Sequence, residues 1–132
     1  MISNITYKNR KIAMIIRSGY LKKRGINFFT ESKLNQQVAF MRHPKNHYIQ
    51  PHMHKKTKRI IYGTTEVLII LDGKMKIDFY NKKKKFICSR LAKKNDIIIL
   101  LSFGHGFKML KNCKFIEVKQ GPYHIKEDKN KF

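Results

Sequence analysis

Two histidines one residue apart, His52 and His54, are the residues with the clearest capacity for chemistry in this chain. In an extended strand the side chains at positions i and i+2 point to the same face, so both imidazoles can converge on one point while Met53 faces away. Glu66, in TTEVLIIL, and His105, in SFGHGF, follow later. Imidazole is the commonest metal ligand, and with a carboxylate it suits zinc, iron, manganese or nickel. The alternative is that the two histidines are exposed surface residues with no functional role.

The chain has only eight acidic residues, so each carboxylate can be weighed separately. Asp72 and Asp96 are expected in turns, and Asp78 on the solvent face of a strand. Glu66 heads an apolar strand and Glu117 lies inside Phe-Ile-Glu-Val. An unpaired buried charge is costly, so these two need a partner, which a metal, a substrate hydroxyl or a lysine can supply.

Short segments rich in Ile, Val, Phe and Tyr, separated by turn residues, predict the elements that must position these side chains. They favour an all-β sandwich or barrel, in one domain of 132 residues. Asp72-Gly73 is a typical hairpin turn, because glycine accepts positive φ. Residues 1–12 and the tail 124–132 are polar and are expected to be loosely ordered. The predicted strands are residues 38–41, 66–71, 74–80, 86–91, 97–101 and 114–119.

The charge is strongly positive, with 30 Lys and Arg against eight acids and a formal net of +22. Such a balance can indicate a nucleic-acid partner. The excess is mostly lysine, however, spread along the whole chain, and its richest run, residues 82–85, falls in an expected turn. No helix-turn-helix or zinc-finger spacing accompanies it. We therefore favour a solvated basic surface, which also steers an anionic small substrate toward the protein, over a nucleic-acid interface.

The compartment is expected to be the cytoplasm. No run of about 18 apolar residues exists, and the start of the chain lacks the pattern of a signal peptide. Cys88 and Cys113 are isolated and are expected to be reduced core thiols.

The order of the candidate ligands resembles that of the cupin superfamily. His52-Met53-His54 matches the H-x-H of its first motif, and Glu66 followed by six residues and Gly73 matches E-x6-G. The second motif is similar to residues 95–105, which end in His105. Eleven residues separate His54 from Glu66 where the motif has three or four, so an expanded loop is expected there.

The resemblance implies a single-domain cupin-type β-barrel (jelly roll), with the motifs in residues 34–119. It also implies one divalent metal ion held by His52, His54, Glu66 and His105, with coordination positions left open for substrate. The runs GHGFKML and IEVKQGPY resemble a group of small cupins found with surface-polysaccharide and nucleotide-sugar biosynthesis. A homodimer is expected by analogy with cupins.

The expected function is a metal-dependent isomerase or epimerase that acts on a small anionic sugar or nucleotide-sugar. Glu117 and Tyr62 are candidate proton carriers in that reaction. An iron-dependent dioxygenase, a non-catalytic binding or sensing module and a basic nucleic-acid binder remain alternatives.

Overall fold

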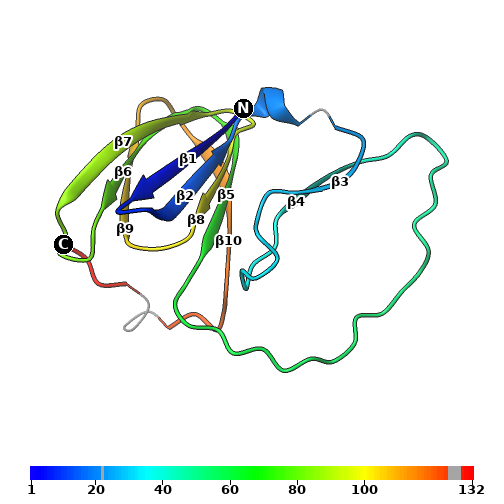
Figure 1. Ribbon diagram of the computed structural model, residues 1–132. Helices are drawn as coiled ribbons and strands as arrows, with labels where there is room; N and C mark the ends of the chain where they lie inside the picture. Colours follow the sequence, from blue (N-terminus) through cyan, green and yellow to red (C-terminus); the bar gives the residue numbers. More distant parts are fainter. Residues whose placement is uncertain (22, 125–128) are drawn as a thin grey trace. The chain divides into compact units, whose positions relative to one another are not determined.

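The computed structural model describes residues 1–21, 23–124 and 129–132 and is all-β, as expected, with antiparallel pairing in each of its sheets (Figure 1). It divides into two compact units. The sheet unit comprises residues 1–20 and 64–132, and the hairpin unit comprises residues 21–63. Among the described residues, no helix is long and apolar enough to span a membrane.

The sheet unit contains one sheet of five strands and one of three. The larger sheet has the order β1-β2-β8-β5-β10, and the smaller has the order β7-β6-β9. The described strands do not join these sheets into a closed barrel. The bounds in the larger sheet are β1 (Ile2–Tyr7), β2 (Arg10–Ile16), β8 (Ile97–Leu100), β5 (Glu66–Asp72) and β10 (Lys114–Lys119), and in the smaller β7 (Phe86–Lys93), β6 (Lys74–Tyr80) and β9 (Gly104–Met109).

One hydrophobic core is shared by the two sheets. In β6 every second side chain is buried, which places Met75, Ile77 and Phe79 on the core face. Leu68 and Ile98, from the larger sheet, belong to the same buried cluster. The strands that line the cavity described below therefore pack against a close-packed hydrophobic core.

The N-terminus is not loosely ordered, contrary to the expectation for residues 1–12. β1 and β2 form an antiparallel hairpin through Lys8 and Asn9, both of which have positive φ. β2 lies between β1 and β8, and residues 12–16 are buried without alternation. A strand that is covered on both faces is stabilised by a continuous run of apolar residues, and Ile-Ala-Met-Ile-Ile is such a run. A 3-10 helix, η1 (Ser18–Tyr20), follows.

The expected hairpin at Asp72-Gly73 is a turn of another kind. β5 pairs with β8 and β10, whereas β6 pairs with β7 and β9, so this turn carries the chain from one sheet to the other. Gly73 has φ +92, which confirms the need for glycine. The predicted lysine-rich turn does close a hairpin between β6 and β7, where the Asn81 side-chain oxygen accepts hydrogen bonds from the backbone N–H groups of Lys83 and Lys85.

The turn between β7 and β8 contains Asp96, a fully buried carboxylate. Its oxygens accept hydrogen bonds from the Arg17 guanidinium at 2.8 Å, the Ser18 N–H at 3.2 Å and the Lys93 N–H at 3.1 Å. The charge is therefore paired, as a buried carboxylate requires. The expectation that Asp96 lies in a turn is confirmed, but Asp96 also ties the residues after β2 to the start of β8.

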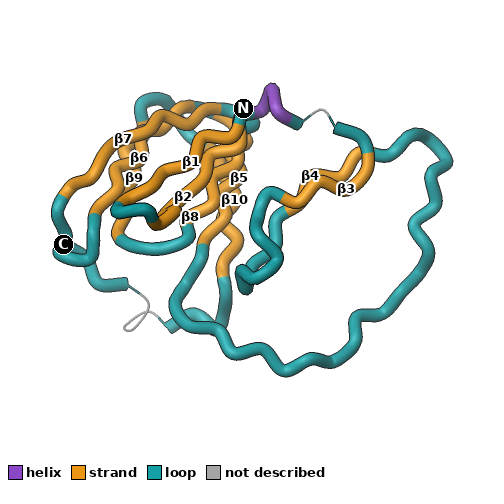
Figure 2. Tube along the Cα trace, viewed as in Figure 1, coloured by secondary structure: helices purple, strands orange, loops and turns teal. Residues whose placement is uncertain are grey.

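The hairpin unit contains β3 (Gly25–Phe28) and β4 (Ala39–Arg42), paired antiparallel. Residues 49–64 form no strand, so the expectation that His52 and His54 share the face of an extended strand is wrong (Figure 2). This segment is polar and exposed and provides too little apolar surface to be held in a sheet. Of the expected loose tail, residues 125–128 lie outside the described part of the chain.

Candidate functional site

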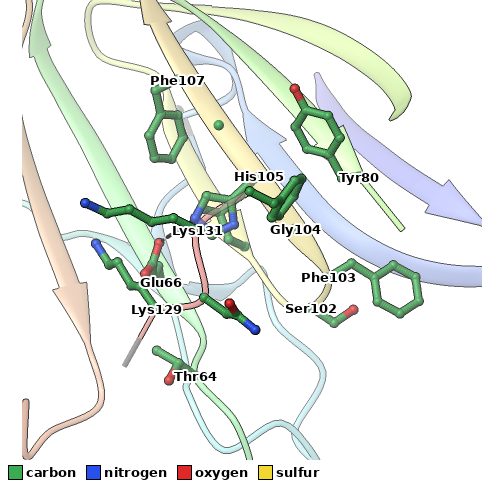
Figure 3. A pocket seen from close by; sticks show the side chains of 14 residues that line it. Thr64, Glu66, Tyr80, Ser102, Phe103, Gly104, His105, Phe107, Lys129 and Lys131 are labelled. Carbon is green, nitrogen blue, oxygen red and sulfur yellow. Dashed lines mark ion pairs between the residues drawn. The ribbon is translucent and has the colours of Figure 1, made fainter. Parts of the chain in front are cut away.

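A cavity of about 670 Å³ lies in the sheet unit and has an acid-base pair in its wall (Figure 3). Strands from both sheets contribute to it, because Glu66 begins β5 and Leu100 ends β8 in the larger sheet. Tyr80 ends β6 in the smaller sheet, where residues 104–107 of β9 also line the cavity. The described residues 129–132 complete the lining.

Glu66 and His105 are brought into direct contact, with the Glu66 Oε2 atom 3.0 Å from the His105 Nε2 atom. Glu66 is held in register by Leu100 of β8 on one side and Lys119 of β10 on the other. His105 lies opposite Phe79 in the β6–β9 ladder. The two side chains therefore project into the cavity from different sheets. Glu66 is 7% exposed, so its charge depends on partners in the cavity wall.

The hydrogen bond from His105 lowers the pKa of Glu66, although burial opposes this effect. The charges of His105, Lys129 and Lys119 lower the pKa of Glu66 further. Glu66 is therefore ionised at neutral pH and accepts the hydrogen bond, so Nε2 of His105 must carry the proton that is donated. In the neutral imidazole this leaves Nδ1 as the nitrogen that accepts a proton.

Aromatic side chains and two lysines form the rest of the relevant wall. Phe107 is two residues after His105 on β9, so the two side chains share a face of the strand, and their ring centroids are 5.2 Å apart. Tyr80 faces the cavity from β6. Lys129 and Lys131 bring ammonium groups to the side of the cavity where Glu66 lies (Figure 3). The cavity thus combines apolar surface with a few charged groups, as small-molecule sites do.

The histidine pair that motivated the metal hypothesis belongs to the hairpin unit. The His52 and His54 rings are 5.4 Å apart between centroids, and both residues are exposed. The Nδ1 atom of His52 lies 2.9 Å from the backbone oxygen of Gln50. The structure therefore brings the four expected ligands together as two pairs, Glu66 with His105 and His52 with His54, each within its own unit.

The described residues contain no group of three or more His, Cys, Asp or Glu side chains placed to hold one metal ion. In the sheet unit, the Nε2 atom of His105 is hydrogen-bonded to the Glu66 carboxylate. This donor set does not by itself fit a metal centre, and we derive no chemical step through a metal. The four-ligand site stays a prediction.

The two candidate proton carriers are not part of the cavity wall as the structure describes it. Glu117 is exposed on β10, with its Oε1 atom 3.8 Å from the Lys119 ammonium, so the apolar burial expected for this acid is not found. Tyr62 lies in the hairpin unit and is 89% exposed.

Sequence reasoning did not select Tyr80, Lys129, Lys131 or Phe132 as site residues. Tyr80 stood out only as the last residue of a predicted strand. The other three lie in a tail whose polar composition predicts loose order, and no local pattern in it signals a cavity-lining role.

Comparisons with models of protein families, with curated proteins and with solved structures find no match for this chain. The resemblance to cupins consequently depends on the motif residues His52, His54, Glu66, Gly73 and His105.

Proposed function

We propose that this chain binds a small, anionic sugar or nucleotide-sugar in the cavity of the sheet unit and acts on it as an isomerase or epimerase. The observation that carries the proposal is the contact of 3.0 Å between Glu66 and His105 in the cavity wall. A volume of about 670 Å³ is in the range of small-molecule sites, and the nearby ammonium groups favour a negatively charged ligand. We also retain the cupin-type barrel and the homodimer as proposals.

The pair of Glu66 and His105 has the chemistry that such a reaction needs. Ionised Glu66 fixes the His105 tautomer and stabilises the imidazolium that forms when Nδ1 takes a proton. A carbon-bound hydrogen next to a sugar carbonyl is acidic enough to be such a proton. Its removal gives an enediol or enolate. Return of a proton to the neighbouring carbon, with transfer of the hydroxyl proton between the two oxygens, completes an isomerisation, whereas return of a proton from water to the opposite face of the same carbon completes an epimerisation. One proton leaves carbon and one returns, and the proton on the imidazolium exchanges with solvent in between, so no oxidant or reductant is consumed.

Exchange of carbon-bound hydrogen with solvent tests this proposal. We expect the wild-type protein, incubated in D₂O with a panel of nucleotide-sugars that contain a keto group, to replace a sugar C–H by deuterium for at least one member, as followed by proton NMR. His105→Gln removes the base and should slow exchange by about 10²- to 10⁴-fold. Glu66→Gln should also slow exchange, because a neutral amide stabilises the imidazolium less.

His124→Gln provides a matched control, because His124 is exposed and lies outside the cavity wall. It should exchange at the wild-type rate. Binding without exchange or product would favour the non-catalytic binding module, and failure of the wild-type protein to bind any nucleotide-sugar or sugar phosphate would refute the proposal.

A further inference from the structure

The segment of residues 129–132 contributes every described lysine in the cavity wall. Lys129 and Lys131 lie on the side of the cavity where Glu66 is found (Figure 3), and the charge of Lys129 lowers the pKa of Glu66. Glu66 has the one side-chain carboxylate among the described lining residues. The lysine ammonium groups of the wall therefore outnumber its carboxylate side chains, two to one.

Phe132 holds this segment against the sheet unit. Its ring meets the Tyr80 ring edge to face, with 5.2 Å between the centroids and 88° between the planes. The Lys84 ammonium lies 5.4 Å from the centre of the Phe132 ring. Phe132 therefore has an aromatic partner on β6 and a cationic partner on the turn between β6 and β7, and both kinds of contact are stabilising.

Gly104 makes room for this ring. A Cβ atom on Gly104 would lie 3.0 Å from Cζ of Phe132 and 3.2 Å from Cβ of Tyr80. The ring is thus seated against the backbone of β9, one residue before His105. Phe132 is still 61% exposed, so it acts as an anchor at the edge of the cavity and does not belong to the core.

We propose that Lys129 and Lys131 bind the phosphoryl groups of the ligand and that Phe132 is the positioning residue that holds both lysines at the cavity. This inference rests on the proposed function, because it assumes that the cavity binds an anionic ligand. Ammonium groups bind phosphate as point charges. Two ammonium groups in one cavity wall match the two phosphoryl groups of a diphosphate better than they match a ligand with a single carboxylate. The ligand class is then a nucleoside diphosphate-sugar or a sugar phosphate in preference to a neutral sugar.

Calorimetric titration of the whole chain with UDP-glucose and with inorganic pyrophosphate tests the inference. Lys129→Ala/Lys131→Ala should weaken binding of both probes by roughly 10- to 100-fold, the range for loss of hydrogen bonds to charged groups. Phe132→Ala removes no charge, yet it should weaken binding at least about 5-fold, because the lysines lose their anchor. Phe132→Tyr keeps the ring and should restore most of the affinity.

Lys82→Ala/Lys83→Ala is the matched control, since it removes two exposed charges from the turn between β6 and β7. It should bind both probes with an affinity within about 2-fold of the wild-type value, as expected for screened surface charges. An equal loss in this control would show that only general surface charge matters, and would overturn the inference.

The remaining outcomes separate the inference from the proposed function. If His105→Gln weakens binding of UDP-glucose while the Phe132→Ala and double-lysine variants bind normally, the inference is wrong and the proposed function stands. If the wild-type protein binds neither these probes nor any other nucleotide-sugar, both the inference and the proposed function are refuted. Circular dichroism of Phe132→Ala must match the wild-type spectrum, and Phe132→Tyr provides the rescue if it does not.

Discussion

At the scale of single residues, two buried carboxylates of the sheet unit perform different tasks. Asp96 is fully buried and paired with Arg17, which is the arrangement of a structural ion pair. Glu66 is also buried but is paired with the imidazole of His105, in the wall of a cavity. Burial alone does not distinguish the two. The partner and the open space beside it make Glu66 the candidate for chemistry.

Gly73 carries the first prediction, at the residue scale. Gly73→Ala should lower the free energy of unfolding by about 2–4 kcal/mol, because φ at Gly73 is +92 and a Cβ atom would lie 2.1 Å from the backbone oxygen of Asn112. Urea unfolding followed by circular dichroism measures the loss. Gly106→Ala is the control, since its Cβ atom would meet nothing closer than 3.9 Å. Equal losses in the two variants would contradict the argument.

At the scale of elements, the site depends on which strands pair. β9 pairs with β6, which places His105 opposite Phe79, and β5 lies between β8 and β10 in the other sheet. The turn at Asp72-Gly73 leads from β5 to β6 and so joins the strand that begins with Glu66 to the strand next to His105. A hairpin at this turn would have paired β5 with β6 in one sheet. The change of sheet allows the acid and the base to approach from two sides.

The pairing of β6 with β7 carries a prediction about pH. A hydrogen bond from the Ser89 hydroxyl lowers the pKa of Asp78, and Lys76, 3.2 Å away, adds to the effect. Because the folded pKa is below the unfolded value of 3.8, this stabilisation is present above that value and is lost as the pH falls through the folded pKa. Between pH 6 and pH 2, Asp78→Asn should therefore lose less stability than the wild-type protein.

The size of that difference should be about 1 kcal/mol or less, because Asp78 is partly solvated. Urea unfolding at the two pH values measures it. Asp72→Asn is the control, since Asp72 is exposed and 3.7 Å from Lys94. If Asp78→Asn is as acid-sensitive as the wild-type protein, the hydrogen bond from Ser89 contributes nothing to the folded state.

At the scale of the whole molecule, the net charge of +22 and the division into two units set the conditions for binding. A basic protein attracts anions from a distance, which raises the rate at which an anionic ligand reaches the cavity. Two of the four expected metal ligands belong to each unit. Any test of the four-ligand hypothesis therefore uses the complete chain.

Metal analysis of the chain purified without chelators tests the four-ligand hypothesis. The hypothesis predicts about one divalent ion per chain, lost both in His52→Ala/His54→Ala and in His105→Ala, because each variant removes neutral imidazole ligands. His43→Ala/His47→Ala, which removes a stacked histidine pair of the hairpin unit with ring centroids 4.0 Å apart, should retain the metal. Equal metal content in all four proteins would eliminate the metal hypothesis.

The amino-acid sequence alone determined the strands whose pattern is local. Alternating or β-branched segments gave β5, β6, β7, β8 and β10, and turn residues gave the boundaries between them. It also selected Glu66, because an acid at the head of an apolar strand is locally unusual, whereas His105 was selected by its place in the order of the cupin motifs. The apolar run of β2 carried a signal as well, but such a run is equally consistent with other buried elements.

Tertiary structure alone decided which strands pair, and with them the site. Strand pairing depends on contacts between residues distant in sequence, so the transfer of the chain between sheets at Gly73 could not be read from the turn itself. The same holds for the tail, where Lys129, Lys131 and Phe132 gain a role because Gly104 and Tyr80 provide a seat for the ring. The local sequence of a polar segment does not determine where the segment packs. Its position depends on contacts with residues that are distant in the sequence.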